Sequence, residues 1–246
     1  MNDMERLKVI TDKLESFLLD TLFPIRCIGC GTGKAWLCDQ CLTHIPLRRT
    51  QHCPTCLTQI TPSGEACFAC YGKRSLDGLF VASHYKTKLL SQAIHTYKYR
   101  FVSAVAEPLS KLLLLALHHG ELSLPDLIVP VPLHERRLRF RGFNQSALLA
   151  RNLSTDLVPS FPLPLLENAL MRTRFTTPQM KTESKKERLA NLRDAFSVDP
   201  QMKQEIKGKS IWLVDDVATT GTTLELCARA LKKKGAKSVF GIVLAR

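Results

Sequence analysis

Eight cysteines lie in four pairs near the start of the chain, and two residues separate the thiols of each pair. This spacing lets two thiolates of one tight turn hold a metal ion, and two such turns complete a tetrahedral four-sulfur site. The simplest arrangement is sequential, so that the first two pairs hold one Zn²⁺ and the last two pairs hold another. Both sites would be structural, because the protein fills every ligand position. The predicted ligands are Cys27, Cys30, Cys38, Cys41, Cys53, Cys56, Cys67 and Cys70.

Disulfides, an iron–sulfur cluster and free thiols are the alternative states of these cysteines. Zinc is favoured because structural zinc sites use this spacing and because a reducing compartment prevents disulfide formation. His44 and His52 lie near the pairs, where either could replace a cysteine. A segment of about 45 residues has too small a core to fold alone. We therefore expect metal binding to supply its folding free energy.

The second informative run spans residues 211–224 and reads Ile-Trp-Leu-Val-Asp-Asp-Val-Ala-Thr-Thr-Gly-Thr-Thr-Leu. It predicts a buried strand that ends in two carboxylates, followed by a turn of hydroxyl groups and glycine that opens a helix. Ligands of open α/β sheets bind beyond the carboxyl ends of strands, and a helix N-terminus attracts phosphate. Adjacent carboxylates can accept hydrogen bonds from neighbouring sugar hydroxyls. The alternative is a solvated strand end before an ordinary helix cap.

The implied ligand is therefore a sugar with a phosphate at one end and a free diol. We assign the diol to Asp215 and Asp216. The residues assigned to the phosphate are Ala218, Thr219, Thr220, Gly221, Thr222 and Thr223.

Arginines are concentrated in the segment that precedes this run. Between residues 131 and 193, twelve Lys and Arg stand against five Asp and Glu, which is a net charge of +7. A basic loop after an apolar strand could hold a diphosphate, and the alternative is a solvated basic surface. Aromatic rings lie among these arginines, a combination that also suits single-stranded nucleic acid. The rings are Phe140, Phe143 and Phe175, and the candidate diphosphate arginines are Arg136, Arg137, Arg141, Arg172 and Arg174.

Alternating apolar runs and helical periodicity predict the elements that position these residues. Such alternation is typical of an α/β domain with a largely parallel sheet flanked by helices. The predicted strands are residues 79–83, 127–131, 211–214 and 239–244. The predicted helices are residues 88–97, 104–118, 143–155 and 223–234.

The domain organisation predicted from these patterns has three parts. Residues 1–26 contain an amphipathic helix, residues 27–74 form a double zinc ribbon, and residues 75–246 form the α/β domain. The longest apolar run, residues 112–117, is too short to span a bilayer, and the first residues lack a secretory pattern. We therefore expect a cytoplasmic protein that is not inserted in a membrane. Its net charge of +13 favours phosphate-bearing partners.

The run at 211–224 resembles the phosphoribosyl diphosphate motif of type I phosphoribosyltransferases, in which an acidic pair holds the ribose hydroxyls. The wider chain resembles the ComF family of competence proteins, from about residue 27 to residue 244. Beyond the cysteine pairs, the matching runs are Tyr97-Lys98-Tyr99, residues 129–134 and residues 141–145. Scattered matches are Arg174, Thr176, Gln179, Arg188, Asn191 and Phe196.

This resemblance implies a type I phosphoribosyltransferase fold, with Mg²⁺ accompanying phosphoribosyl diphosphate. It also implies that the segment from Arg172 to Gln179 is a mobile loop over the ligand, from which Arg172 or Arg174 reaches the diphosphate. ComF proteins are associated with incoming single-stranded DNA during natural transformation, so single-stranded DNA is an implied partner.

Two functions remain open from the sequence. The first is a protein that binds phosphoribosyl diphosphate or a related phosphosugar and handles single-stranded DNA. The second is a catalytic phosphoribosyltransferase whose acceptor is unidentified. An acceptor lid would have to come from the residues before 79 or from the insert after residue 131. A third, weaker hypothesis makes the zinc region a docking module for a helicase or a DNA-translocation protein.

Overall fold

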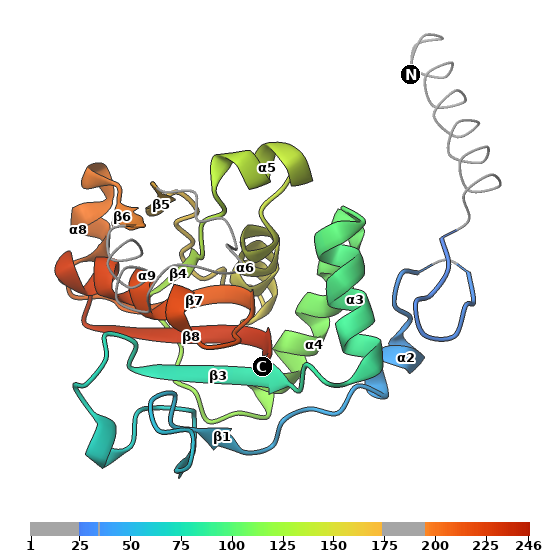
Figure 1. Ribbon diagram of the computed structural model, residues 1–246, viewed down its shortest axis with the longest axis horizontal. Coiled ribbons are helices and arrows are strands. Elements are labelled where there is room, and N and C mark those ends of the chain that lie inside the picture. The colour runs from blue at the N-terminus through green and yellow to red at the C-terminus, as the bar shows by residue number, and fades with distance from the viewer. Residues whose placement is uncertain (1–24, 34, 174–194) are drawn as a thin grey trace, which may run out of the picture. The chain divides into compact units, whose positions relative to one another are not determined.

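The computed structural model describes residues 25–33, 35–173 and 195–246 (Figure 1). The chain forms two compact units, Met1–His44 and Ile45–Arg246, which we describe separately. The amphipathic helix predicted near the N-terminus and the predicted site residue Arg174 lie outside the described residues. The second half of the cysteine-rich region belongs to the same unit as the α/β domain.

The centre of the second unit is a four-stranded sheet in the order β3-β8-β7-β4, with every neighbouring pair parallel. Its strands are β3 (Gly78–Ser83), β4 (Leu127–Pro130), β7 (Ser210–Val217) and β8 (Ser238–Ala245). All four predicted strands and the predicted parallel sheet are confirmed. β7 is longer than predicted, because Asp215 still pairs with Val243 and Val217 with Ala245. Both aspartates therefore lie within the strand.

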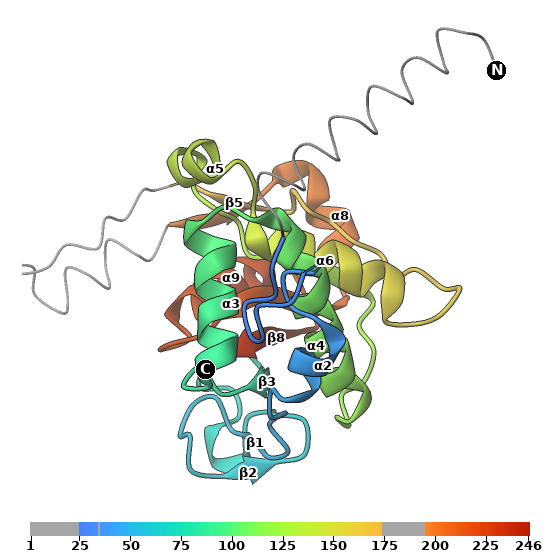
Figure 2. The ribbon, with the colours of Figure 1, turned by 90° about the vertical axis from the view of Figure 1, so that its right-hand side faces the viewer.

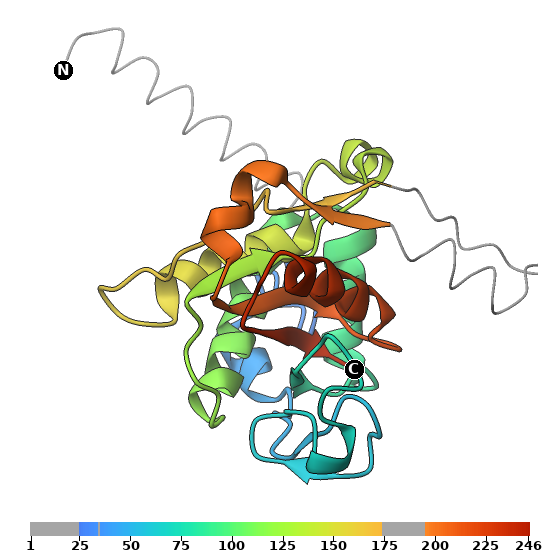
Figure 3. The ribbon, with the colours of Figure 1, turned by 90° about the vertical axis from the view of Figure 1, so that its left-hand side faces the viewer.

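Helices cover both faces of this sheet. Helices α3 and α4 lie on the face that Figure 2 presents, whereas α9 and the hairpin β5–β6 lie on the face in Figure 3. The four predicted helices are confirmed as α3 (Lys88–Tyr99), α4 (Ala106–His118), α6 (Gln145–Asp156) and α9 (Thr222–Lys233). The short elements are β5 (Leu170–Arg172), β6 (Phe196–Val198), α8 (Lys203–Ile206) and 3₁₀ turns at Ser103–Val105 and Pro200–Met202. Among the described residues, no helix combines the length and apolarity needed to cross a bilayer.

The core follows the alternation of side chains along each strand. Leu79, Leu213 and Val243 point to one face, where they pack with Leu224 and Leu231 of α9 in one cluster of buried residues. This packing holds the start of α9 against the carboxyl end of β7, so the two parts of the predicted ligand site share one rigid support.

One segment differs from the prediction. Residues 134–141, expected as a basic loop, contain helix α5 (Glu135–Arg141). His134 caps this helix by accepting a hydrogen bond from the Arg136 backbone N–H at 3.2 Å, and Gly142 ends it with φ of 79°. None of the residues of α5 is buried, so the sequence carries no apolar period that could reveal a helix.

The segment that holds the later cysteine pairs covers the outer edge of β3. It contains β1 (Gln51–His52), β2 (Ile60–Thr61) and a 3₁₀ turn (Phe68–Cys70), and β1 lies beside β3 in Figure 1. The Gln51 side chain pairs with the Val81 backbone in both directions at 3.0 Å, as a neighbouring strand would. An uncovered edge would leave backbone groups free to pair with other chains, so this segment completes the sheet.

Candidate functional site

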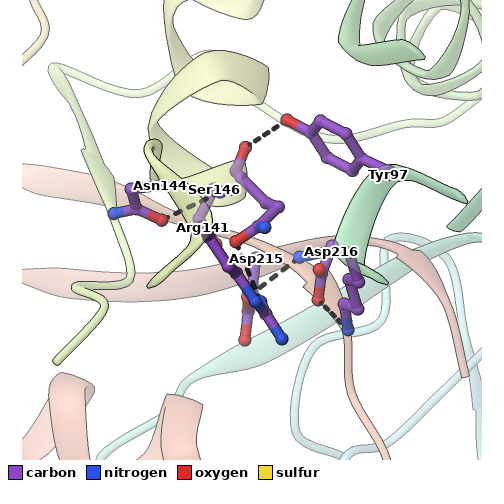
Figure 4. A network of polar contacts seen from close by, with 8 residues as sticks. Tyr97, Arg141, Asn144, Ser146, Asp215 and Asp216 are labelled. Atoms are coloured by element: carbon purple, nitrogen blue, oxygen red, sulfur yellow. Dashed lines mark hydrogen bonds and ion pairs between the residues drawn. The ribbon is translucent and has the colours of Figure 1, made fainter. Parts of the chain in front are cut away.

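Asp215 and Asp216 lie near the carboxyl end of β7, and they have different partners (Figure 4). Oδ1 of Asp215 accepts hydrogen bonds from Ser146 Oγ at 2.8 Å and from the Asp216 backbone N–H at 2.9 Å. Oδ1 of Asp216 pairs with Lys98 Nζ at 2.8 Å, and Asp216 is buried. Among the described residues these contacts engage only the Oδ1 atoms. The Oδ2 atoms take part in none of them, and a carboxylate oxygen is a hydrogen-bond acceptor of the kind that a sugar hydroxyl requires.

The ionisation of this acid pair depends on pH close to neutrality. Burial and the neighbouring Asp216 raise the pKa of Asp215 to about 7, while Lys98 and the hydrogen bond from Ser146 oppose the shift. A carboxyl whose pKa is raised by folding loses its stability contribution as the pH rises towards that value. Ligand hydroxyls favour the ionised carboxylate, so we expect ligand binding to strengthen over the same pH range.

The hydroxyl-rich turn directly follows the acid pair. The Ala218 backbone N–H donates to the Ala245 carbonyl at 3.1 Å, which fixes the start of the turn to β8. Gly221 caps α9 with φ of 74°, a conformation that favours glycine even though a Cβ there would meet no atom within 4 Å. Thr220 and Thr222 are exposed, with their hydroxyl oxygens 2.8 Å apart. The turn therefore presents hydroxyl groups and the free backbone N–H groups of a helix N-terminus, which suit phosphate.

A polar network connects the segment after β4 to the N-terminus of α6 (Figure 4). Asn144 accepts a hydrogen bond from the Ser146 backbone N–H at 3.1 Å and donates to the Val131 carbonyl at 3.0 Å. The Tyr97 hydroxyl donates to the Gln145 carbonyl at 2.8 Å, and burial together with the charge of Asp216 raises the Tyr97 pKa above its usual range. These contacts fix the position of Ser146, which in turn orients Asp215.

Gln145 contributes an unsatisfied donor to this network. Its side-chain oxygen accepts a hydrogen bond from Arg141 Nη1 at 3.1 Å, whereas its Nε2 is buried and has no hydrogen-bond partner among the described residues. Buried amide groups are rarely left unpaired in native proteins. The Gln145 amide is thus a group that a bound ligand or an ordered water would satisfy.

The structure brings some of the predicted arginines towards the acid pair. Burial lowers the pKa of Arg172, the charge of Arg137 lowers it further, and Asp215 acts in the opposite direction. Arg172 is therefore within electrostatic range of Asp215, and Arg137 within range of Arg172. Arg141 donates to the Gln145 side chain, in the network that supports Ser146. Arg136 is exposed on α5, and its role stays a prediction.

The eight paired cysteines form two groups, in the sequential pairing that the spacing predicted. The Sγ atoms of each group lie within 4.8 Å of one another. A tetrahedral Zn²⁺ with bonds of about 2.3 Å requires sulfurs about 3.8 Å apart. The measured separations include 3.7 Å for Cys27–Cys38 and 3.9 Å for Cys56–Cys67. We call Cys27, Cys30, Cys38 and Cys41 the first cysteine group, and Cys53, Cys56, Cys67 and Cys70 the second cysteine group.

Proton affinities within each group are divided in the way expected for crowded thiols. A hydrogen bond from the Thr58 side chain and backbone hydrogen bonds lower the pKa of Cys56 to about 5. Burial and the neighbouring sulfurs raise the pKa of Cys70 to about 12. A cation among the sulfurs would stabilise the thiolate form of all four, so each group could hold a zinc ion. His44 and His52 belong to neither group.

Three site residues escaped the analysis of individual motifs. Lys98, Ser146 and Gln145 all contact the acid pair or its supporting network, and none was assigned a role from its type. Their positions gave the one sequence signal. Lys98 and Gln145 lie in the matching runs Tyr97-Lys98-Tyr99 and Arg141–Gln145, and Ser146 directly follows the second run. Their partners lie up to 118 residues away along the chain, as in the pair of Lys98 with Asp216. Such pairings cannot be read from local spacing.

Comparisons with known proteins agree with this geometry. The family model of the phosphoribosyl transferase domain matches residues 145–246. Competence protein F of Haemophilus influenzae is 33% identical over 233 residues, which cover 91% of this chain and 98% of that protein. DNA utilization protein YhgH of Escherichia coli K12 is 37% identical over 211 residues, which cover 84% of this chain and 88% of that protein.

A further relative matches a shorter part of the chain. Competence protein ComFC of Bacillus subtilis is 36% identical over 121 residues, which cover 49% of this chain and 44% of that protein. The α/β unit has the type I phosphoribosyltransferase-like fold, a parallel sheet flanked by helices. Given its similarity to competence protein F over almost the full length of both, the chain belongs to the ComF family of competence proteins.

Proposed function

We propose that this protein binds phosphoribosyl diphosphate or a related phosphosugar. The acid pair accepts hydrogen bonds from the ribose diol, and the turn at residues 218–223 holds the 5′-phosphate. One observation carries this proposal: Asp215 and Asp216 stand at the end of a buried strand, directly before a hydroxyl-rich turn that opens α9. The match of this region to the phosphoribosyl transferase domain supports it.

The diphosphate would lie towards the basic side chains around the acid pair. Arg172 provides positive charge within range of Asp215, and Arg137 adds positive charge near Arg172. Arg172 is partly buried, which strengthens its attraction for an anion. Arg174, which lies outside the described residues, completes this predicted set. Mg²⁺, when bound with the ligand, neutralises diphosphate charge, and the oxygens of the acid pair are the type of ligand it prefers.

A pair of sugars that differ in one hydroxyl tests the role of the acid pair. We expect ribose 5-phosphate to raise the unfolding temperature more than 2-deoxyribose 5-phosphate, because only the first sugar carries two adjacent hydroxyls for the carboxylates. At a concentration of 100 times Kd, stabilisation should reach about 2.7 kcal/mol. An equal rise in unfolding temperature with the two sugars would show that the acid pair does not bind the diol.

We further propose that the protein handles incoming single-stranded DNA in the cytoplasm during natural transformation. Exposed rings at the end of α3 and on α5 support this step. Phe101 and Phe140 lie edge to face with ring centroids 5.2 Å apart, and the Arg141 guanidinium lies 5.6 Å from the centre of the Tyr99 ring. We call Tyr99, Phe101, Phe140, Arg139 and Arg141 the aromatic–basic patch.

This patch has the composition of a single-strand binding surface. Rings stack bases without regard to sequence, and arginines follow the phosphate backbone. Phe140 is 75% exposed, which leaves its ring accessible. Phe143, predicted with it, instead packs on buried Tyr97 at 5.5 Å and supports the network described above. The names of the relatives, competence protein and DNA utilization protein, are consistent with a role in DNA handling.

Substitution of one exposed ring tests the patch. We expect Phe140→Ala to weaken binding of a single-stranded oligonucleotide by about 5- to 100-fold, as loss of one stacked base predicts. Phe161→Ala is the matched control, because that ring is also exposed, at 66%, but lies outside the patch. Fluorescence anisotropy at several salt concentrations would measure both. Equal affinities for the two variants would exclude the patch as the binding surface.

Catalytic phosphoribosyl transfer is the second candidate, and the electrostatic contact of Arg172 with Asp215 favours it. It predicts acceptor-dependent release of diphosphate that disappears in the Asp215→Asn/Asp216→Asn variant. Release that persists in this variant would exclude transfer at this site. A helicase or DNA-translocation protein is the proposed protein partner, and the zinc region, residues 27–74, is the proposed docking module.

A further inference from the structure

A pocket of about 170 Å³ lies between the segment of the second cysteine group and β3. This volume is enough for roughly five water molecules at about 30 Å³ each. Its lining residues are Arg48, His52, Leu57, Leu79, Val81 and Arg246, none of which belongs to the acid pair, the hydroxyl-rich turn or the cysteine groups. The pocket is therefore separate from the proposed phosphosugar site.

All polar side chains that line this pocket are hydrogen-bond donors. Arg48 Nη2 donates to His52 Nδ1 at 2.8 Å, and because a guanidinium cannot accept, this contact makes Nδ1 the acceptor. The neutral His52 ring then carries its hydrogen on Nε2. Arg246 adds a second guanidinium. A ligand that matches these three side chains must accept hydrogen bonds only, which is the property of an oxyanion.

The positive charge around the pocket is not balanced by an acidic side chain in the described part of the chain. No side-chain carboxylate of the described residues lies within ion-pair distance of Arg48, Arg74 or Arg246. Burial lowers the pKa of Arg246, and the charges of Arg48 and Arg74 lower it further. Partly buried positive charges repel one another, which destabilises the folded protein. A bound anion would remove this repulsion.

The backbone around both lining arginines is fixed. The Arg48 backbone N–H donates to the Ala82 carbonyl at 2.7 Å, and its side-chain Nε donates to the Thr50 carbonyl at 2.9 Å. The Arg246 carbonyl accepts a hydrogen bond from the Tyr85 backbone N–H at 3.1 Å. The Arg48 guanidinium is pre-positioned by its contacts with Thr50 and His52, so it loses less conformational freedom when it binds, which favours affinity.

We propose that this pocket is a second anion site, which binds a phosphate group between Arg48 and Arg246. Two guanidiniums match the charge of a phosphate dianion, and their planar forks match the geometry of its oxygens. Leu57, Leu79 and Val81 supply the apolar part of the lining. The phosphate could belong to free phosphate, to a phosphorylated sugar or to the end of a nucleic-acid strand.

Calorimetric titration of the full-length, zinc-loaded protein with inorganic phosphate tests this site. All titrations use a Thr222→Glu background, because a carboxylate at the start of α9 repels phosphate from the hydroxyl-rich turn. We expect Arg246→Gln to weaken phosphate binding about ten-fold or more, as loss of a charge-assisted contact predicts. Arg49→Gln makes the same charge change on an exposed neighbour outside the pocket, and it should change affinity less than about two-fold.

Arg246→Gln with unchanged affinity, or a Thr222→Glu protein that binds no phosphate at millimolar concentration, would overturn the proposal. NMR of the arginine Nε–H groups is a second readout that needs no pocket variant. There the Arg48 and Arg246 signals should shift on addition of phosphate, whereas the Arg49 signal should not. Unshifted signals would also overturn the proposal. Ribose 5-phosphate and a 5′-phosphorylated oligonucleotide, each compared with its unphosphorylated form, then identify the molecule that carries the phosphate.

Discussion

The first and second cysteine groups use the same ligands at the same spacing, but they are attached to different parts of the protein. The first group lies in the compact unit that ends at His44, and its last cysteine is in the short helix α2 (Asp39–Thr43). The second group lies in the unit that contains the sheet. The same metal-binding pattern can thus form a separate module or an integral part of a neighbouring fold.

Several contacts join the segment of the second group to the α/β fold, among them a hydrogen bond from the Leu79 backbone N–H to the Gly64 carbonyl at 2.8 Å. Two further contacts flank the group. On one side of the group, the Gln51 amide pairs with the Val81 backbone. On the other side, the Glu225 carboxylate of α9 accepts hydrogen bonds from the backbone N–H groups of Ser75 and Leu76, at 3.0 and 3.1 Å. The second group is therefore held against both β3 and the helix that opens with the hydroxyl-rich turn. We infer that it stabilises the ligand site, whereas the first group does not.

Removing each group in turn should have the largest effect. We expect Cys53→Ser/Cys56→Ser to abolish cooperative unfolding of the α/β unit, because structural zinc contributes on the order of 10 kcal/mol, as much as a whole domain's stability. Cys27→Ser/Cys30→Ser should change the stability of the same unit by less than about 1 kcal/mol. Scanning calorimetry of both variants, with zinc content as a check, makes the measurement. Similar losses in the two variants would show that the groups are equivalent.

The Gln51 contact should have the next largest effect. Gln51→Leu removes both hydrogen bonds to Val81 and leaves two buried backbone groups unsatisfied, which costs about 2–4 kcal/mol. Gln59→Leu is the control, since that side chain is exposed in the same segment. Urea denaturation monitored by tryptophan fluorescence would report both free energies of unfolding. If Gln51→Leu and Gln59→Leu had the same free energy of unfolding, the Gln51 side chain would not be a structural part of the sheet edge.

The Glu225 contact is expected to be somewhat weaker, because the side chain is only partly buried. Glu225→Ala should destabilise the α/β unit by about 1–3 kcal/mol, the range for loss of hydrogen bonds to a charged group. It should also increase hydrogen exchange at Ser75 and Leu76. Glu205→Ala, an exposed glutamate of α8, serves as the control. Unchanged exchange at both amides would remove the link between α9 and the second group.

The smallest expected effect concerns one backbone position in each group. The residue after the second cysteine has positive φ in both, 75° at Gly31 and 65° at Leu57. Gly31→Ala should therefore weaken zinc binding by the first group, and Leu57→Gly should strengthen zinc binding by the second group. Each change in the free energy of zinc binding should be about 1 kcal/mol or less. Competition with a chelator would measure both. Effects of the same sign would show that backbone strain does not distinguish the groups.

The features that could be predicted from the sequence are those whose signal is local. Short apolar runs revealed the four sheet strands, and cysteine spacing revealed both metal groups. Helix α5 was missed because none of its residues is buried, so hydrophobic periodicity is absent. The roles of Lys98, Gln51 and Glu225 were missed because each contacts residues at least 30 positions away, at distances set by the fold.

Calorimetric titration with phosphoribosyl diphosphate and Mg²⁺ tests the central claim most directly. We expect saturable binding by the wild-type protein and by Asp156→Asn, an exposed control on α6. The Asp215→Asn/Asp216→Asn variant should bind at least about a hundred-fold more weakly, because it loses two charge-assisted contacts. Equal binding by this variant, or no binding by the wild type, would contradict the claim that the acid pair holds a phosphosugar.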